Sequence, residues 1–276
     1  MSLAHHLNLP LENTMLRLLK ALPLTLALAA LSIFATSCST GTTQARFFNA
    51  LPDTQDYGNT GLDVNFNGTK EFTNVAFPSA SASTYAAVPA GSVQIEGFET
   101  GGITTEVFDH TLSLSAGKQY TVVATGSAAN GGNAALLTPV DTNTAPGNGS
   151  VNFRVINASP SGPNGTQAAV DIYILPNPNP CSPGTSGCAP TMAALAYKST
   201  SSYVTLPFSP VGSGWQMIVT VAGAPTPIIN ATIGGFGSAS VGAICTLVLT
   251  DQANVQQMST TPVALQDLNT AGCTVN

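Results

Sequence analysis

The chain of 276 residues is 43% hydrophobic and only 7% charged, and its formal net charge is −6 at pH 7. Helix surfaces normally carry many Lys, Glu and Arg residues, so this composition argues against an α-rich fold. Nucleic acid is excluded as a partner because phosphate binding requires clustered Lys and Arg. The 26 Gly and 19 Pro residues favour β-strands joined by uncharged turns.

The N-terminal segment has the features of a secretory signal peptide. Arg17 and Lys20 precede an apolar run over residues 21–34, and small residues follow it before Cys38. The run is short for a membrane-spanning helix, which needs about 20 apolar residues. We therefore predict a signal peptide over residues 1–37. The pattern is compatible with a translation start at either Met1 or Met15.

The residues around the predicted cleavage point resemble a bacterial lipobox, in which a lipidated cysteine becomes the mature N-terminus. They read Ala-Thr-Ser-Cys and end at Cys38, with Ala35 where the lipobox prefers Leu. Cleavage by an ordinary signal peptidase is the alternative. Because the chain has five cysteines, lipidation of one would leave four to pair in an oxidising compartment. We expect attachment to a membrane through Cys38, with residues 38–43 as a short tether.

The residue after the cysteine indicates which membrane would hold the protein. Ser39 is not the Asp that retains some lipoproteins of Gram-negative bacteria at the inner membrane. The expected location is therefore the cell envelope, as an outer-membrane or cell-surface lipoprotein.

An internal repeat organises the rest of the chain. Residues 46–52 read Arg-Phe-Phe-Asn-Ala-Leu-Pro, and residues 154–160 read Arg-Val-Ile-Asn-Ala-Ser-Pro. Further matches follow in the same order: Tyr85 with Tyr203, Thr121 with Thr246, and the segment from Thr138 with the segment from Thr261. We predict two homologous domains over residues 44–141 and 151–276, joined by a linker of residues 142–150 that is rich in Gly, Asn and Pro.

Short β-rich runs recur in both domains between turn residues. Asn67-Gly68 is a strong hairpin signal, and residues 92–96 and 216–220 approach the period of two that places one face of a strand on a core. About seven such strands per domain predict an all-β fold of two tandem immunoglobulin-like β-sandwiches. Small barrels are the alternative.

The second domain holds the four remaining cysteines. Cys181 and Cys188 bracket a short Ser/Pro/Gly-rich insertion, which predicts a disulfide that closes an exposed loop. Cys245 on a late strand and Cys273 in the tail would then form the second disulfide, although four cysteines allow three pairings. A zinc site lacks the usual Cys and His spacing, and we expect no metal.

The repeated signature is similar to a family of secreted bacterial domains, domain-of-unknown-function family 4397. The similarity rests on residues 46–52 and 62–66, on their counterparts 154–160 and 170–174, and on the turn Pro89-Ala90-Gly91, which the second domain lacks. It implies an exported β-sandwich module that is often repeated and often lipid-anchored. It implies no activity.

Residues able to support catalysis are sparse. His110 is the single histidine after residue 37, and no Gly-x-Ser-x-Gly motif accompanies it. A group of carboxylates could in principle serve a glycoside hydrolase, but solvated charges at strand edges are the more ordinary interpretation; these are Glu96, Glu99, Glu106 and Asp109. We expect no enzyme activity and no cofactor.

Three other groups of residues are candidates for pairing or binding. Arg46 with Asp63, and Arg154 with Asp171, are predicted to form ion pairs between adjacent strands. A calcium site in the loop after residue 51 is a weaker hypothesis than ordinary turn chemistry; its ligands would be Asp53, Asp56, Asn59 and Asp63. An aromatic platform for a sugar is the third hypothesis; its members would be Trp215, Tyr197, Tyr203 and Phe208.

The leading functional hypothesis is a lipid-tethered β-sandwich protein that acts as a structural or binding module at the cell envelope. Its partner would be an envelope polymer, a glycan or a protein. A carbohydrate-binding protein is the alternative, and it requires an exposed Trp215. A secreted glycoside hydrolase is a third hypothesis, and it requires a cleft with two carboxylates.

Overall fold

The protein is described by a computed structural model. It covers residues 41–276 except 54–60, 82–84, 102–105, 129–133, 148, 209–213, 235–241, 254 and 269–272. The chain divides into residues 1–40 and one compact unit of residues 41–276. The predicted signal peptide and Cys38 therefore lie outside the described residues. Within the described ranges, no helix is long and apolar enough to cross a membrane.

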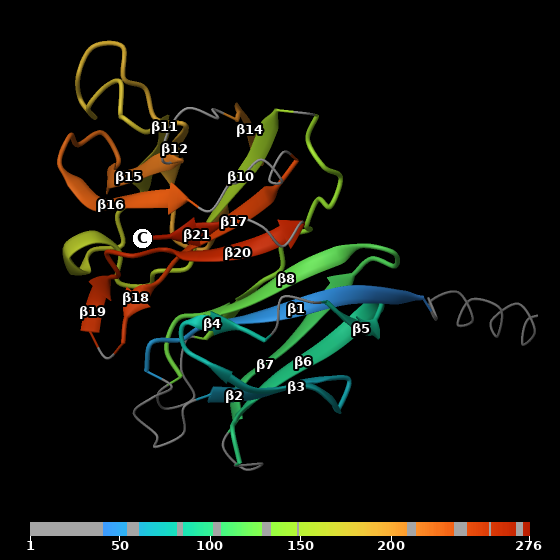
Figure 1. Ribbon diagram of the computed structural model, residues 1–276. Coiled ribbons are helices and arrows are strands. Elements are labelled where there is room, and N and C mark those ends of the chain that lie inside the picture. Colours follow the sequence, from blue (N-terminus) through green and yellow to red (C-terminus); the bar gives the residue numbers. More distant parts are fainter. Residues whose placement is uncertain are drawn as a thin grey trace, which may run out of the picture. The chain divides into compact units, whose positions relative to one another are not determined.

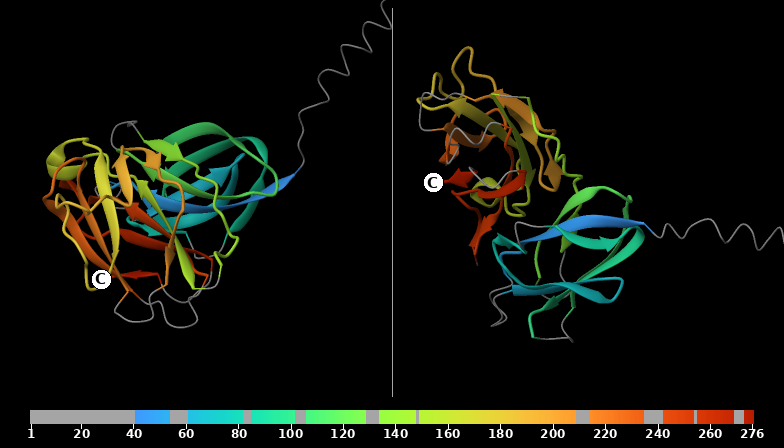
Figure 2. Two further views of the ribbon diagram at one scale, coloured as in Figure 1. Left: turned by 90° about the horizontal axis from the view of Figure 1, so that it is seen from above. Right: turned by 45° about the vertical axis from the view of Figure 1, so that its right-hand side comes forward.

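Two facing sheets, here called the N-terminal sheet pair, form the first half of the compact unit (Figure 1). One sheet has the order β4-β1-β8-β9, with β5 also on β1, and the other has the order β3-β2-β6-β7. The right-hand view of Figure 2 shows β1 and β8 in one layer and β2 and β3 in the other. The strands are β1 (Thr42–Ala50), β2 (Gly61–Phe66), β3 (Thr69–Ala76), β4 (Ser79–Ala80), β5 (Ala86–Pro89), β6 (Gly91–Glu99), β7 (Glu106–Leu114), β8 (Gln119–Thr125) and β9 (Ala135–Leu137).

The C-terminal sheet pair follows the same plan. One sheet has the order β13-β10-β17-β20, with β14 also on β10, and the other has the order β12-β11-β15-β16-β21. A small separate hairpin, β18–β19, projects from it. The strands are β10 (Ser150–Asn157), β11 (Val170–Pro176), β12 (Met192–Leu195), β13 (Ser199–Thr200), β14 (Val204–Pro207), β15 (Trp215–Val221), β16 (Pro227–Gly234), β17 (Ile244–Leu249), β18 (Asp251–Gln252), β19 (Val255–Met258), β20 (Val263–Leu268) and β21 (Thr274–Val275).

Each sheet pair contains one parallel pairing at its centre. β1 runs parallel to β8, and β10 runs parallel to β17, whereas the other described pairings are antiparallel. Parallel strands require a long crossover connection, which in this fold passes through the second sheet of each pair. The carboxyl ends of β1 and β8 consequently lie at one edge, as do those of β10 and β17.

The core comprises three apolar clusters, and one of them joins the two halves. The first two fill the sandwiches and include Phe47 and Phe153, respectively. The third unites Phe48, Ala50 and Val123 of the N-terminal pair with Ile156, Ala158, Val248 and Leu265 of the C-terminal pair. Strands β1 and β10 therefore bury both faces over most of their length, including the polar residues that they carry.

The local turn chemistry agrees with the sequence prediction. Asn67 and Gly68 connect β2 to β3 with φ values of 49° and 75°, which is the left-handed geometry of a two-residue hairpin turn. Asn49 and Asn157 occupy equivalent places at the strand ends. Each side-chain amide donates to a backbone carbonyl, and each side-chain oxygen accepts the N–H two residues later. The prediction of an all-β sandwich fold is confirmed.

Candidate functional site: a buried arginine–aspartate network

Two arginines lie in the interior between the sheet pairs. Arg46 on β1 and Arg154 on β10 are each only 1% exposed. Burying a guanidinium group is unfavourable unless carboxylates and hydrogen-bond acceptors surround it. Their surroundings therefore show how the two halves are joined.

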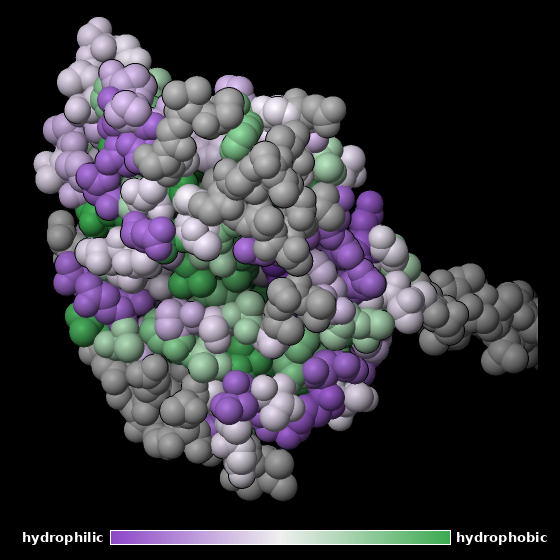
Figure 3. Space-filling view, viewed as in Figure 1, coloured by the Kyte–Doolittle hydropathy of each residue, from purple (hydrophilic) through white to green (hydrophobic). Residues whose placement is uncertain are grey.

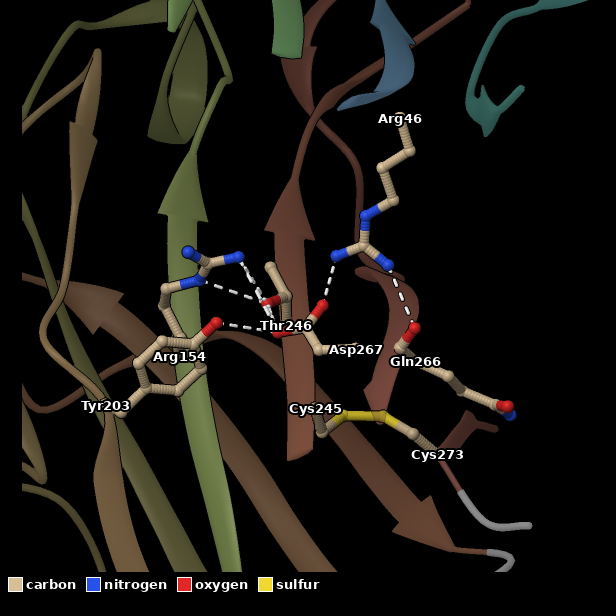
Figure 4. The surroundings of a disulfide bond; sticks show 8 residues. All are labelled: Arg46, Arg154, Tyr203, Cys245, Thr246, Gln266, Asp267 and Cys273. Carbon is tan, nitrogen blue, oxygen red and sulfur yellow. Dashed lines mark hydrogen bonds and ion pairs between the residues drawn. A yellow bond between two sulfur atoms is a disulfide. The ribbon is translucent and has the colours of Figure 1, made fainter. Parts of the chain in front are cut away.

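Each arginine reaches across to the other sheet pair, and Figure 4 shows the contacts of Arg46 with Gln266 and Asp267. Arg46 donates from Nη1 to the carbonyl of Gln266 at 2.9 Å and from Nη2 to the carboxylate of Asp267. Arg154 donates from Nη1 to the carbonyl of Val140 at 3.1 Å and from Nη2 to the carboxylate of Asp141 at 2.5 Å. The pairing is reciprocal, as in an interface related by twofold symmetry.

Residues of the same half complete each site. The Nε of Arg46 donates to Thr121 at 2.9 Å, and the Nε of Arg154 donates to Thr246 at 3.0 Å. Each aspartate also accepts hydroxyl hydrogen bonds from its own half, at 2.5–2.8 Å. We call these eight residues the arginine–aspartate network: Arg46, Tyr85, Thr121, Asp141, Arg154, Tyr203, Thr246 and Asp267.

The two tyrosines also cover the arginines. The ring of Tyr85 lies 5.2 Å from the guanidinium carbon of Arg46, and the ring of Tyr203 lies 4.7 Å from that of Arg154. These distances fit cation–π contacts. Tyr85 and Tyr203 therefore bind the arginine of their own half by the ring and the aspartate of their own half by the hydroxyl.

The electrostatics of the network favour the charged form of Arg46 and the neutral forms of Tyr85 and Tyr203. Burial acts to lower the pKa of Arg46, but the nearby Asp267, Tyr85 and Asp141 outweigh it, and the pKa is raised. Burial raises the pKa of Tyr85 and of Tyr203, and the neighbouring aspartates raise both further against the opposing arginine. Both hydroxyls therefore stay protonated and serve as donors.

The prediction that Arg46 pairs with Asp63 and Arg154 with Asp171 is wrong. Asp63 accepts from Lys70 Nζ at 2.6 Å and from the N–H of Asn74 at 2.9 Å. Asp171 accepts from the N–H groups of Ala194 and Gly223 at 2.7 and 2.8 Å. Asn74 and Ala194 both have φ of 51°. The aspartates thus hold irregular, left-handed residues of the neighbouring strands, a function that charge alone does not reveal.

Hydrogen bonds also decide the protonation of Asp63. Burial acts to raise its pKa, but the bonds from Lys70, from the N–H of Asn74 and from Thr100 outweigh burial, so the pKa lies below the ordinary value. Asp63 is therefore ionised at neutral pH.

Both predicted disulfides are present. Cys181 pairs with Cys188, and Cys245 pairs with Cys273. The first closes the insertion loop after β11, and the second ties the segment before β21 to β17. Disulfides are typical of oxidising compartments, which indicates an exported protein.

The aromatic platform does not form as predicted. Trp215 is 3% exposed, and it packs against Phe153 and Phe208 with ring centroids at 5.1 and 6.1 Å. Tyr203 belongs to the arginine–aspartate network, and Tyr197 lies beside Lys198 and Thr125. The exposed tryptophan that the carbohydrate-binding hypothesis requires is therefore a core residue. Apolar packing in the sandwich explains the difference.

The carboxylates proposed for a hydrolase do not all share one face of their sheet. Glu96 and Asp109 lie opposite each other on β6 and β7, while Glu99 is only 8% exposed and faces the core beside Leu62. The interpretation of Glu99 as a solvated edge charge is wrong. Nε2 of His110 lies 3.1 Å from the carbonyl of Ala134, so the described contacts of this imidazole include no nucleophile.

The calcium hypothesis falls partly on undescribed residues. Asp56 and Asn59 lie outside the described part of the chain. Asp53 accepts from Ser127 and from the N–H of Ala128, which is turn chemistry. Across the described ranges, no group of three or more His, Cys, Asp or Glu residues could hold a metal ion.

A groove marks the boundary between the halves on one face. Its cavity of about 370 Å³ lies between β4 and β20 and is lined by residues 78–80, 263–266 and Arg46. Figure 3 shows hydrophobic residues gathered across the middle of this face, where β4 and β20 lie. The boundary is therefore apolar at its rim and ionic inside.

Fold and network together define an all-β protein in which two β-sandwiches are fused through reciprocal buried ion pairs. The model of one family, described as a domain of unknown function (DUF4397), matches residues 43–173. The match spans the N-terminal sheet pair, the predicted linker, β10 and the first part of β11, and it supports the predicted similarity over that stretch. No curated protein matches the chain.

Two solved structures resemble the chain weakly. One is titled "Alpha-glucan binding by a streptococcal virulence factor"; it has 11% identity and a TM-score of 0.26, over 79% of this chain and 96% of the other. The second is titled a product complex of a multi-modular glycogen-degrading pneumococcal virulence factor, SpuA; it has 10% identity and a TM-score of 0.25, over 81% of this chain and 22% of the other. This chain thus spans about a fifth of SpuA. Such TM-scores support no functional argument.

Sequence reasoning missed the two aspartates that the arginines use. Asp141 and Asp267 follow the matched segments that begin at Thr138 and Thr261, but nothing local shows that each faces the other half. The matched Thr121 with Thr246 and Tyr85 with Tyr203 were the available signal. Polar residues that recur at the same place in both halves are candidates for contact with the recurring arginines.

Proposed function

We propose that this protein is a lipid-anchored, extracytoplasmic module that acts as a structural or binding unit at the cell envelope and carries no catalytic activity. One observation carries the proposal. The structure pairs four of the five cysteines with one another, and the remaining one is Cys38, which ends the lipobox-like sequence. A cysteine in that context is the natural attachment point for lipid.

The two sheet pairs are proposed to be products of a duplication. The repeated sequence signature, the equivalent strand order and the equivalent network residues support this. A duplicated domain that buries its own arginine against its twin becomes a single stiff body. Such a body is suited to holding a surface at a fixed place above a membrane.

The anchor is tested by expressing the full chain with its own signal segment in a bacterial host. Intact mass and partitioning between membrane and soluble fractions are measured for the wild type and for Cys38→Ala. We expect a mature mass that begins at Cys38 with added acyl groups, and loss of both the acyl mass and membrane association in the variant. Cys181→Ala/Cys188→Ala is the matched control and should remain membrane-bound.

A soluble, unmodified wild type would overturn the anchor. The protein would then be freely secreted, and its partner would be sought in the medium or matrix.

A further inference from the structure

The carboxyl ends of the four central strands converge on one cavity. It has a volume of about 290 Å³, and both sheet pairs line it. Asp53 and Ser127 follow β1 and β8, and Ser161 and Asp251 follow β10 and β17. The hydroxyl of Thr125 donates to the carbonyl of Ala158 at 2.6 Å, which fastens the two sets of strand ends together. The cavity is thus built by the same junction as the arginine–aspartate network.

A buried carboxylate forms part of the wall. Asp251 is 2% exposed and accepts hydrogen bonds from the Ser159 hydroxyl and from the N–H of Ser161. Among the described residues no Lys, Arg or His lines the cavity, and Asp251 takes part in no ion pair there. Buried carboxylates are normally compensated by a cation, and burial raises the pKa of Asp251. A cationic ligand would restore that balance, whereas a neutral sugar would not.

The rest of the lining suits an alkylammonium group. An ammonium head has three N–H donors, and the wall supplies acceptors from Asp53, Asp251 and the exposed Gln256. Val255, which is 46% exposed, and two prolines provide apolar contact for a methylene chain. The volume is near the lower limit of small-molecule pockets, so it fits a side-chain-sized group.

The cavity lies at the end of β1 that is remote from the proposed anchor. Cys38 precedes β1 by four residues, which span at most about 14 Å. β1 then extends about 30 Å from its amino end to the cavity, at about 3.3 Å per residue. An anchor at Cys38 would therefore keep the start of β1 near the membrane, and the cavity would open at the opposite end of the strand.

We infer that the cavity walled by Asp53, Asp251 and Gln256 binds an alkylammonium group, presented by a free diamine or by a lysine side chain of an envelope partner. The distance of the cavity from a membrane rests on the proposed lipid anchor, but the chemistry of the cavity does not. The two can therefore fail separately.

The test titrates 1,5-diaminopentane into full-length protein in detergent by calorimetry. The neutral analogue is 1,5-pentanediol, and the side-chain analogue is Nα-acetyl-lysine amide, whose side-chain ammonium is free. We expect saturable binding of the diamine, no binding of the diol, and at least a tenfold loss of affinity in Asp251→Asn. Asp109→Asn, which removes an exposed carboxylate on β7, should bind as the wild type. Preference for the lysine analogue would identify a protein or peptide source of the ammonium group, and preference for the diamine a free amine.

A second readout covers the case in which Asp251→Asn does not fold. Amide NMR shifts of the wild type on addition of diamine should concentrate at Ala128 and Ser161, and Gln256→Ala should weaken binding several-fold. The inference is overturned by an absence of saturable binding, by equal affinity in Asp251→Asn, or by calcium displacing the diamine at equal concentration. Diamine binding that persists in Cys38→Ala while the wild type is soluble would refute the anchor alone.

Discussion

The two sheet pairs share a strand order but hold their interiors together differently. The N-terminal pair packs a set of phenylalanines, with Phe47, Phe72 and Phe108 at centroid separations of 6.1 and 6.3 Å, and no described residue in it is a cysteine. The C-terminal pair centres on Phe153 and Trp215 and adds two disulfides. Core packing is thus interchangeable between equivalent folds.

What the two pairs keep in common is the network at their junction. Each contributes one Arg, one Thr, one Tyr and one Asp in matching geometry. Removing one arginine takes away the shortest ion pair of the aspartate in the other half. That aspartate keeps only the longer contact with the arginine of its own half, at 3.6 Å for Asp267 and 4.0 Å for Asp141. The comparison predicts equal sensitivity at the junction and unequal sensitivity within the cores.

The largest effect is expected from removing either arginine. Arg46→Ala and Arg154→Ala should each lower the free energy of unfolding by about 3–5 kcal/mol, because each removes the nearest cation of a buried aspartate. Urea unfolding measured by circular dichroism gives both values, and Trp215 fluorescence reports the C-terminal pair separately. Lys118→Ala, at an exposed position, should change stability by less than about 0.5 kcal/mol. A large loss for only one arginine would show that the two sites are not equivalent.

Removal of the disulfides should distinguish the two sheet pairs, because both disulfides lie in the C-terminal pair. Removing Cys245–Cys273, with a sequence separation of 28, should cost roughly 3.5 kcal/mol, and removing Cys181–Cys188, with a separation of 7, roughly 2.5 kcal/mol. Double Cys→Ala variants are compared by denaturant unfolding. The longer loop loses more because its unfolded chain gains more freedom. The reverse order would mean that the tail segment before β21 contributes little to the fold.

The tyrosine hydroxyls should have a smaller effect that depends on pH. Tyr85→Phe and Tyr203→Phe should each cost about 1.5–3 kcal/mol at neutral pH, since each bond ends on a carboxylate. The pKa of both tyrosines is raised above the ordinary value of 10.0, so the unfolded chain loses these protons first. Their contribution to stability is therefore complete below about pH 10 and falls as pH rises above it.

Melting temperatures measured from about pH 8 to about pH 11, a range that spans the ordinary tyrosine pKa, check this expectation. Each Tyr→Phe variant should show a shallower alkaline loss than the wild type. Tyr173→Phe, outside the network, should cost less than about 1 kcal/mol at neutral pH. An unchanged alkaline slope in both variants would remove the tyrosines from the account.

The smallest effects are expected at the two aspartates that hold neighbouring strands. Asp63→Ala and Asp171→Ala should each cost about 1–2 kcal/mol, because each leaves a strand N–H without its acceptor. The pKa of Asp63 lies below its ordinary value of 3.8. Its contribution is therefore present above about pH 4 and is lost as pH falls through the lower, folded-state pKa.

Acid melts of Asp63→Asn test the sign of this effect. The variant should lose less stability than the wild type on acidification, and Asp109→Asn is the matched control. A steeper acid loss in Asp63→Asn would contradict the assignment.

Local sequence signals predicted the local parts of the structure well. Asn67-Gly68 predicted its hairpin, and the insertion loop between Cys181 and Cys188 favoured the observed pairing among the three that four cysteines allow. Alternating residues 92–96 correctly placed one face of β6 on the core. These features depend on residues close in sequence or on chemistry that only one partner can satisfy.

Long-range pairing could not be read in the same way. Arg46 and Asp267 are 221 residues apart, and the nearer Asp63 offered an equally plausible charge. The sequence does not distinguish a buried Trp215 from a member of a binding platform, because an amphipathic aromatic fits both an interior and a surface. Only the fold shows that the third apolar cluster brings the two halves together and buries what lies between them.

The reciprocal exchange of ion pairs is tested most directly by double-mutant cycles of unfolding free energy. Arg46→Ala is combined with Asp267→Ala in one cycle and with Asp63→Ala in another, and Arg154→Ala is likewise combined with Asp141→Ala and with Asp171→Ala. We predict coupling of about 2–3 kcal/mol for Arg46 with Asp267 and for Arg154 with Asp141, and less than about 0.5 kcal/mol for the other two combinations. Strong coupling of Arg46 to Asp63 and of Arg154 to Asp171, with none across the junction, would contradict the account.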